Sequence, residues 1–297
     1  MLQALITAPA LRTLLASGTP QLLCDCTFDL ADPAAGARLH AQRHLPGAIH
    51  IDLDGDMAAP KQASAGRGRH PLPDPEAFAS RLRQLGFADN LPVVAYDSAG
   101  GMYAARLWWM LRWLGHGAVQ VLDGGLNSWV AAGGVVAAGA PAAALAGALA
   151  VAQSATAAGP FTRRPTLVTQ VDFAGLLAKL GRPPRLIVDA RAPDRFRGEN
   201  ETLDPVGGHI PGAANRFFRH NLGPDGCFKP AEQLRAEWLA LLAGRAPADV
   251  VAQCGSGVTA CHNLLALDAA GLPGAALYPG SWSEWCAQPQ APIATGA

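Results

Sequence analysis

The chain has 297 residues, half of them hydrophobic, and its 23 basic and 23 acidic residues give a formal charge of zero. This length is sufficient for two domains, and the balanced charge without a Lys/Arg block argues against nucleic acid as a partner. Its apolar runs are too short for a membrane span, and its first residues lack the basic region of a secretory signal. With only six cysteines, no disulfide framework is expected. We therefore expect a cytoplasmic protein that does not contact membranes.

Four short motifs in the first half of the chain recur in the second half, in the same order and with similar separations. The pairs are Leu22–Cys26 with Ile187–Arg191, Arg43–Ala48 with Gly208–Ala213, Val93–Asp97 with Val250–Cys254, and Leu122–Gly125 with Tyr278–Ser281. Shared order over four motifs is typical of a duplicated domain. The alternative, two unrelated domains with similar turns, explains the order less well.

Each copy alternates short β-like runs with stretches that have helical apolar spacing. The clearest helical stretches are Glu76–Gly86 in the first copy and Ala231–Leu242 in the second. This alternation predicts an α/β fold in which each domain has a mainly parallel sheet flanked by helices. Ligands of such sheets bind at the carboxyl ends of the strands.

Domain boundaries follow from composition. Residues 1–137 form the expected N-terminal domain and residues 161–297 the expected C-terminal domain. The segment 138–160 between them consists mostly of Ala and Gly and is interpreted as a linker. An Ala-rich helix is the alternative interpretation of that segment.

One cysteine stands out as the candidate nucleophile. Cys254 follows the apolar run 249–253 and begins a Gly-rich loop that leads into a helical pattern over 263–268. Such a loop directs backbone N–H groups inward and places the sulfur near a helix N-terminus, and both effects favour the thiolate. A cysteine phosphatase would need an arginine at the sixth position after the cysteine, where this chain has Ala260. We therefore expect sulfur chemistry rather than phosphate-ester hydrolysis.

The remaining cysteines are interpreted as structural. Cys24 and Cys26 lie in a β-like run without a second ligand pair nearby, which favours core packing over a metal site. Cys261 follows the loop and is either a buried small side chain or a resolving thiol. The expected chemistry requires no metal and no organic cofactor.

Several motifs together resemble the tandem-domain sulfurtransferases of the rhodanese superfamily, and the loop is most similar to that of the 3-mercaptopyruvate sulfurtransferase branch. The motifs are Cys254–Ala260, the turns His44–Ala48 and His209–Ala213, Asp189–Arg191 with Arg195–Gly198, and Gly280–Trp285. The resemblance covers nearly the whole chain and implies two domains of one fold, of which only the C-terminal one is catalytic. Asp97 occupies the position equivalent to Cys254, and a carboxylate cannot accept sulfane sulfur, so we expect the N-terminal domain to be inert.

The loop residues also bear on the sulfur donor. In relatives that prefer thiosulfate, the two positions after the cysteine are typically basic, but here they are the neutral Gly255 and Ser256. The resemblance therefore favours 3-mercaptopyruvate as donor. It also implies that the backbone of Gly255, Gly257, Val258 and Thr259 surrounds the substrate.

The family mechanism pairs the loop serine with a histidine of the N-terminal domain and an aspartate. On this pattern Ser256 is expected to act with His44. Gly36 falls near the family position of the aspartate and Asp32 or Asp29 lies nearby, of which Asp32 is taken as the candidate. The resemblance also implies that Arg195 binds the donor. A second family arginine is missing from the stretch 202–206, and Arg197 or Arg216 would be its substitute.

These inferences predict a two-step reaction. The Cys254 thiolate takes sulfur from a small-molecule donor, most simply 3-mercaptopyruvate, to form a persulfide and release pyruvate. The persulfide then passes its sulfur to cyanide, a small thiol or a thioredoxin-like protein. Two alternatives stay open: thiosulfate as the donor with cyanide as acceptor, and a non-catalytic persulfide carrier.

Overall fold

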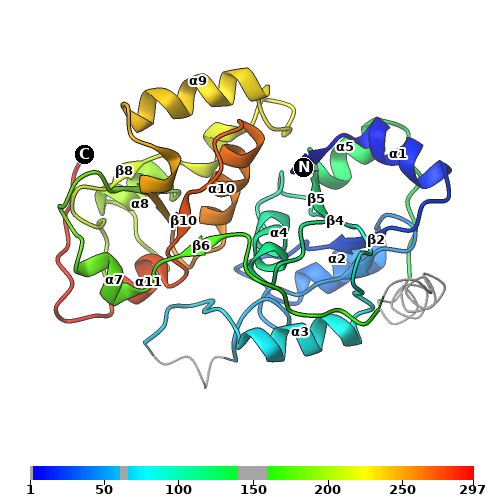
Figure 1. The fold of residues 1–297 in the computed structure, drawn as a ribbon, viewed down its shortest axis with the longest axis horizontal. Helices are drawn as coiled ribbons and strands as arrows, with labels where there is room; N and C mark the ends of the chain where they lie inside the picture. The colour runs from blue at the N-terminus through cyan, green and yellow to red at the C-terminus, as the bar shows by residue number, and fades with distance from the viewer. Residues whose placement is uncertain (1–2, 61–65, 140–158) are drawn as a thin grey trace. The chain divides into compact units, whose positions relative to one another are not determined.

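The computed structural model describes residues 3–60, 66–139 and 159–297, which form two compact units (Figure 1). Unit 1 comprises Met1–Ala58, Pro73–Leu167 and Pro224–Cys227, and unit 2 comprises Ala59–Leu72, Val168–Gly223 and Phe228–Ala297. The predicted linker, residues 138–160, lies outside the described residues apart from two residues at each end.

Each unit contains a five-stranded parallel sheet, and the two sheets share one topology. The order is β1-β5-β4-β2-β3 in unit 1 and β6-β10-β9-β7-β8 in unit 2, so the strands of the two units correspond one to one. The strands are β1 Leu5–Ile6, β2 Leu22–Asp25, β3 Ile49–His50, β4 Val93–Tyr96, β5 Val119–Leu122, β6 Thr169–Gln170, β7 Leu186–Asp189, β8 Ala214–Asn215, β9 Val250–Gln253 and β10 Ala276–Leu277. The shared order confirms the predicted repeat and the α/β fold class.

The central strands are buried along their whole length because helices cover both faces of each sheet. All four residues of β2, β4, β7 and β9 are buried, which explains why these runs are apolar without alternation. At the carboxyl edge Asp189 of β7 pairs with Gln253 of β9, and β2 and β4 end in the same register. The next residues, Cys254 and Asp97, therefore begin equivalent loops at the edge where parallel sheets bind ligands.

Helices connect these strands. They are α1 Ala8–Ala16, α2 Ala35–Gln42, α3 Pro75–Gln84, α4 Ala104–Trp113, α5 Gly125–Ala131, α7 Phe173–Leu177, α8 Pro193–Arg197, α9 Ala231–Leu242, α10 Thr259–Ala269 and α11 Ser281–Trp285, with short 3-10 turns at Phe218–Asn221 and Pro247–Asp249. The side chain of Asp74 accepts hydrogen bonds from the first amides of α3, and Pro75 provides a preformed first turn. The predicted helices over 76–86 and 231–242 thus correspond to α3 and α9.

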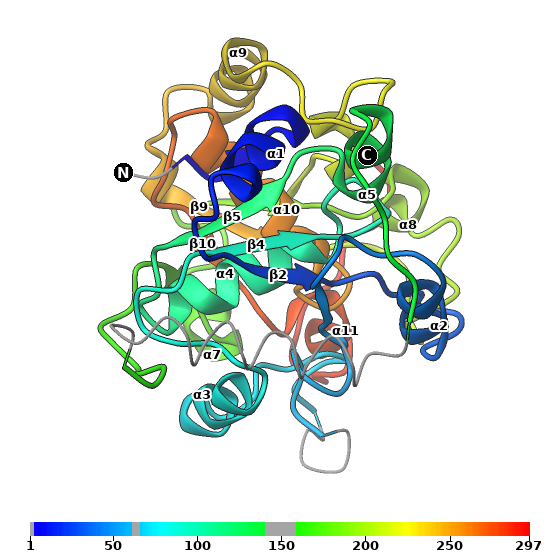
Figure 2. The same cartoon turned by 90° about the vertical axis from the view of Figure 1, so that its right-hand side faces the viewer.

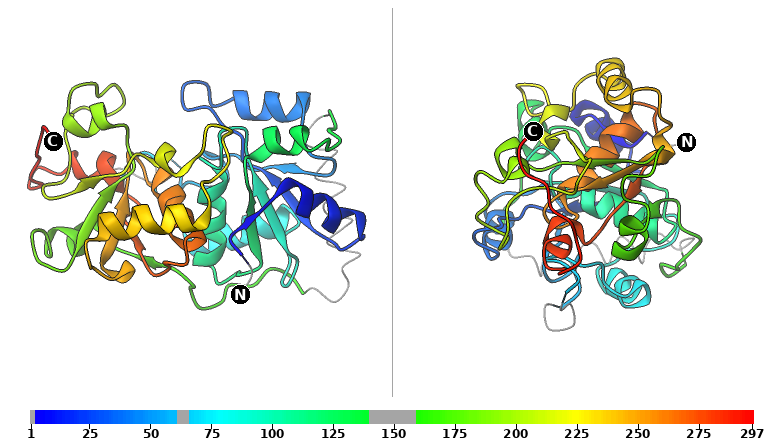
Figure 3. Two further views of the ribbon diagram at one scale, coloured as in Figure 1. Left: turned by 90° about the horizontal axis from the view of Figure 1, so that it is seen from above. Right: turned by 90° about the vertical axis from the view of Figure 1, so that its left-hand side faces the viewer.

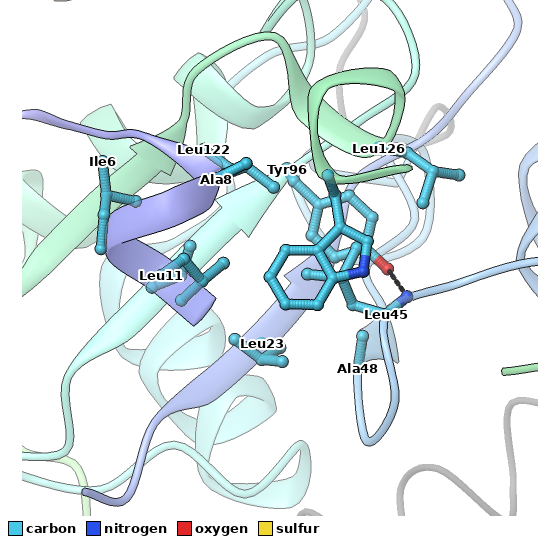
Figure 4. Packing of buried hydrophobic residues seen from close by; sticks show 11 residues of the cluster. Ile6, Ala8, Leu11, Leu23, Leu45, Ala48, Tyr96, Leu122 and Leu126 are labelled. Carbon is cyan, nitrogen blue, oxygen red and sulfur yellow. Dashed lines mark hydrogen bonds between the residues drawn. The ribbon is translucent and has the colours of Figure 1, made fainter. Parts of the chain in front are cut away.

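The core of unit 1 lies between its sheet and the helices α1 and α5. Figure 2 shows α1 and α4 on opposite sides of β5 and β4. Leu11 of α1, Leu23 of β2 and Leu122 of β5 pack in one buried cluster with Trp129 (Figure 4). The hydroxyl of Tyr96 accepts a hydrogen bond from the backbone amide that follows His44, 3.0 Å away, which anchors the turn after α2 to the sheet.

In unit 2, one face of the sheet is covered by α10, which follows β9 as α4 follows β4 in unit 1. The helix α10 packs against α9 and against β9, and Figure 3 shows α9 in yellow beside α10 in orange. Ile187, Val251, Trp282 and Trp285 belong to a second buried cluster on the α11 side of the sheet. Within the described ranges, none of the helices combines the length and the apolar character that a membrane crossing requires.

The two units exchange segments, which the predicted boundaries do not anticipate. Residues 59–72 come from the N-terminal half of the chain yet pack in unit 2, where the backbone amide of Arg69 donates to the Ser283 hydroxyl at 3.0 Å. Residues 161–167 pack in unit 1, because backbone hydrogen bonds tie them to the turn that ends α4. A simple division at residue 161 therefore misses tertiary hydrogen bonds that composition does not reveal.

The loop after β4 is closed around the Asp97 carboxylate. One carboxylate oxygen accepts from the amides of Ala99 and Gly101 at 2.7 and 2.9 Å. The other accepts from the amides of Tyr103 and Ala104 at 2.8 and 2.9 Å. Burial raises the pKa of Asp97 above its ordinary value, and the four amide hydrogen bonds act in the opposite direction. The amides of this loop are thus satisfied by a side chain of the protein, the Asp97 carboxylate.

Replacing Asp97 with alanine is expected to destabilise the protein, because four buried amides would lose their acceptor. We expect a loss of about 3 kcal/mol in the free energy of unfolding, measured by chemical denaturation. The matched control is Asp32→Ala, which removes an exposed aspartate of the same unit that pairs with Arg38, and should change stability by less than about 0.5 kcal/mol. Equal effects from the two substitutions would contradict this account of the loop.

Candidate active site

The Cys254 loop joins β9 to α10 and is buried from Cys254 to Val258, while Thr259 is the partly exposed first residue of the helix. The backbone amide of Gly257 donates a hydrogen bond to the Cys254 sulfur at 3.2 Å. Gly257 has a φ of 77°, a left-handed conformation that favours glycine and turns its amide toward the sulfur. The loop sequence thus directs a backbone donor at the candidate nucleophile.

The first turn of α11 holds the other side of this loop. The amide of Trp282 donates to the carbonyl oxygen of Cys254 at 3.0 Å, and the amide of Ser283 donates to that of Gly255 at 2.9 Å. The Ser281 hydroxyl accepts from the Cys254 amide at 3.1 Å. In each peptide unit the carbonyl and the N–H group point in opposite directions. Because the carbonyls of Cys254 and Gly255 point toward α11, the N–H groups of the same peptide units point away from it.

Arg191 fixes α11 relative to the sheet. Its guanidinium pairs with Asp189 at 2.7 Å and lies over the Trp282 ring, 4.7 Å from its centre. Burial by itself would lower the pKa of Arg191, but the charges of Asp189 and Glu201 outweigh that effect and raise it. This side chain is therefore a permanent cation that links the end of β7 to the helix supporting the loop.

Ser256 has a histidine partner, and that partner is His70. The Nδ1 atom of His70 lies 2.7 Å from the Ser256 hydroxyl oxygen, and both side chains are buried. Both residues belong to unit 2, because His70 lies in the exchanged segment 59–72. His70, and not the expected His44, is the histidine hydrogen-bonded to Ser256 within unit 2.

His44 has a different set of contacts within unit 1. Its Nδ1 donates to the carbonyl oxygen of His40 at 2.7 Å, and its ring stacks on the His40 ring at 4.1 Å. His40 in turn pairs with Asp25 at 3.0 Å. Asp32 is exposed and pairs with Arg38, whose hydrogen bond lowers the pKa of the Asp32 carboxyl. Asp32 therefore does not support His44, and these contacts explain both residues as structural.

His70 was not predicted from the sequence, because it lies outside the four repeated motifs. The pairing of motifs drew attention to the turn that occurs in both copies, and His44 belongs to that turn. The stretch Gly66–Pro71 has no counterpart among the four repeated motifs. One signal in the sequence could have identified it: His70 lies in a Gly-rich, basic segment that interrupts the first copy of the domain.

Two guanidinium groups lie beside Gly255, the residue that follows the nucleophile. A Cβ atom built on Gly255 would lie 2.8 Å from Nη2 of Arg69 and 3.6 Å from Nη2 of Arg195. Arg195 also pairs with Glu201 at 2.8 Å, and Asp204 contacts both arginines. Burial would raise the pKa of Glu201, but the hydrogen bonds from Arg195 and from loop amides outweigh it and lower that pKa.

The two arginines named as substitutes for the missing family arginine have other partners. Arg197 is exposed and pairs with Glu199 at 2.7 Å. Arg216 pairs with Glu237 at 2.9 Å and lies over the Trp238 ring. Arg69, which sequence analysis did not single out, instead contributes the second cation beside the loop.

The other cysteines do not form a second reactive site in the structure. All six thiols are free, and Cys24 and Cys26 are buried in unit 1. Cys261 is buried on α10 and its thiol donates to the carbonyl oxygen of Gly257 at 3.3 Å. Over the ranges 3–60, 66–139 and 159–297, no group of three His, Cys, Asp or Glu side chains is arranged to hold a metal ion.

The combination of a loop thiol, a paired hydroxyl and imidazole, and two nearby guanidiniums has a clear chemical capacity. The thiol can act as a nucleophile, the Ser256–His70 pair can hold or move a proton, and the cations can bind a small anion. These groups belong to one unit and converge at the carboxyl edge of one sheet.

Comparison with known proteins agrees with this architecture. The family model described as "Rhodanese-like domain" matches twice, over residues 7–132 and 172–288. Each match covers four of the five strands of one sheet, β2 to β5 or β7 to β10, and includes the equivalent loop.

Similar proteins are known over the full length of the chain. It is 47% identical over 293 residues to a probable 3-mercaptopyruvate sulfurtransferase of Pseudomonas aeruginosa, covering 98% of each chain. It is 37% identical over 297 residues to the putative thiosulfate sulfurtransferase SseB of Mycobacterium tuberculosis, covering 99% of this chain and 98% of that one. Among solved structures, the 3-mercaptopyruvate sulfurtransferase from Leishmania major is 28% identical with a TM-score of 0.78, over 98% of this chain and 76% of that one. Two matched domains, a shared strand order and close relatives of this kind show that the chain belongs to the rhodanese family, as a tandem-domain sulfurtransferase.

Proposed function

We propose that this sulfurtransferase takes sulfur from 3-mercaptopyruvate and carries it as a persulfide on Cys254. The observation that carries the proposal is the neutral Ser256 hydroxyl, hydrogen-bonded to His70, beside a loop flanked by two arginines. 3-Mercaptopyruvate has one carboxylate for a cation and a thiol and ketone for hydrogen bonds. The relative with 47% identity, a probable 3-mercaptopyruvate sulfurtransferase, supports the same donor.

The first half-reaction is a displacement at sulfur. The Cys254 thiolate attacks the donor sulfur, an S–S bond forms, and the carbon–sulfur bond breaks. The bonding electron pair moves onto carbon and gives the enolate of pyruvate, which takes a proton to become pyruvate. The enzyme then holds one additional sulfur atom, as a persulfide, and no external oxidant or reductant has been used.

In this scheme Ser256 and His70 handle the proton and Arg195 binds the carboxylate. The 2.7 Å contact allows the Ser256 hydroxyl to pass a proton between substrate and imidazole. The amide of Gly257, together with those of Gly255, Val258 and Thr259, would stabilise the anionic sulfur in the loop. Arg195 is a cation beside Gly255. Glu201 neutralises its charge only in part, because Glu201 also pairs with Arg191.

The second half-reaction returns the enzyme to its thiol form. A thiolate acceptor, either a small thiol or a thioredoxin-like protein, attacks the outer sulfur and leaves with it, and cyanide would do the same. Unit 1 takes no chemical part, because Asp97 stands where unit 2 has the nucleophile. Six free thiols fit a reducing cytoplasm, which we propose as the location.

Thiosulfate is the alternative donor, and a specific observation favours it. Two guanidiniums lie beside the loop, and a relative with 37% identity is a putative thiosulfate sulfurtransferase. Single-turnover loading of the enzyme with each donor at equal concentration distinguishes them. Faster loading by thiosulfate would overturn the assignment of 3-mercaptopyruvate, and loading by neither donor would favour a carrier that receives sulfur from another protein.

Cys254→Ser is expected to abolish sulfur loading. Intact-mass analysis after addition of 3-mercaptopyruvate should show the wild-type chain heavier by about 32 Da, one sulfur atom, and the variant unchanged. Cys261→Ser is the matched control, because it replaces a buried thiol in the first turn of α10, the helix that follows the loop, and it should still load. Loading of the Cys254 variant would contradict the proposed nucleophile, and loss of loading in the Cys261 variant would implicate that thiol.

His70→Asn is expected to slow loading from 3-mercaptopyruvate by about a hundredfold, because the Ser256 hydroxyl loses its proton partner. His44→Asn should change the rate by less than about threefold, because the contacts of His44 are structural. Stopped-flow measurement of pyruvate release by both variants checks this. A larger effect at His44 than at His70 would restore the pairing expected from the family pattern.

A further inference from the structure

Asp204 is placed between the two cations that flank the loop. Its carboxylate contacts Nη1 of Arg69 through one oxygen and Nη2 of Arg195, at 3.4 Å, through the other. The Asp204 side chain is only 3% exposed, whereas Arg69 and Arg195 are 30% and 19% exposed. A largely buried carboxylate thus bridges the two guanidinium groups.

The cations themselves face the position next to the nucleophile. Because Gly255 has no side chain, Arg69 Nη2 approaches to within 2.8 Å of where a Cβ atom would be. The side-chain hydrogen bonds of Arg69 to the described residues run through Nη1, toward Asp204 and the carbonyl oxygen of Leu203. Nη2 therefore lies beside Gly255, the residue that follows the nucleophile.

The local charges balance before any donor binds. The connected ion pairs comprise three positive charges, on Arg69, Arg191 and Arg195, and three negative charges, on Asp189, Glu201 and Asp204. A monoanionic donor needs a single guanidinium edge, which Nη2 of Arg69 offers. A dianionic donor would bring a second negative charge close to Asp204, where the surroundings hold little compensating charge and screening is weak.

We infer that Asp204 is a specificity-determining residue. It neutralises Arg69 and Arg195 enough to disfavour dianionic donors such as thiosulfate, while monoanionic α-keto thiols still bind. Arg69 is the second donor-binding cation, and its position beside Gly255 compensates for the absence of an arginine in the stretch 202–206. The inference rests on the proposed function, since it concerns the choice of donor at the same nucleophile.

Asp204→Asn is therefore expected to increase kcat/KM for thiosulfate by about tenfold, mainly through a lower KM, and to change kcat/KM for 3-mercaptopyruvate by less than about threefold. The gain for thiosulfate should shrink as ionic strength rises. Glu199→Gln is the matched control, because it also removes one negative charge that pairs with an arginine of unit 2, but on an exposed surface. It should leave the ratio between the two donors unchanged.

Arg69→Gln is the complementary variant and keeps the test valid if Asp204→Asn folds poorly, which thermal unfolding would reveal. Without Arg69 the charge of Asp204 is less compensated, so kcat/KM should fall for both donors, and more for thiosulfate. An unchanged donor ratio in a folded Asp204→Asn or Arg69→Gln variant would overturn the inference. Failure of the wild-type enzyme to load from either donor would instead overturn the proposed function, so the two failures are distinguishable.

Discussion

A loop that leads from a parallel strand into a helix presents backbone N–H groups that need an anionic partner, and both units are organised by that requirement. In unit 1 the partner is the Asp97 carboxylate, which accepts four amide hydrogen bonds and cannot leave. In unit 2 the equivalent residue is Cys254, whose sulfur accepts from Gly257. A sulfur atom can gain and release a second sulfur while it stays in the same surroundings. At the first position of the loop, the structural loop of unit 1 and the reactive loop of unit 2 thus differ in one side chain, Asp97 or Cys254.

Part of the support of the Cys254 loop has a counterpart in unit 1. The first turn of α11 binds two loop carbonyls, as the amide of Leu126 in α5 binds the carbonyl of Asp97, and Arg191 links α11 to the end of β7. The segment 59–72 then adds His70 to the Ser256 hydroxyl and Arg69 to the Gly255 backbone. The two copies of the fold therefore differ chemically through this segment as well as through the residue that begins the loop, Asp97 or Cys254.

The features that sequence predicted correctly are those that depend on local order. Asp25 and Asp189 each end an apolar run, and the runs proved to be equivalent central strands. The helix over 231–242 was visible from its apolar spacing, and Cys254 from the glycines that follow it. His44 was chosen because the resemblance to the family pointed to its turn, but its contacts with His40 depend on how that turn packs. The family pattern thus led to a structural histidine and away from His70.

The sequence by itself therefore determined the duplicated α/β fold and the family and singled out Cys254 as the candidate nucleophile, because strand, helix and loop preferences are encoded within a few neighbouring residues. Only the tertiary structure decided which histidine meets Ser256, which arginines flank Gly255 and which carboxylate neutralises them. His70 and Ser256 are separated by 186 positions in the chain, and Arg69 and Asp204 by 135. Contacts at such separations arise from the packing of the segment 59–72 against α11 and the loop, and no local pattern of residues specifies that packing.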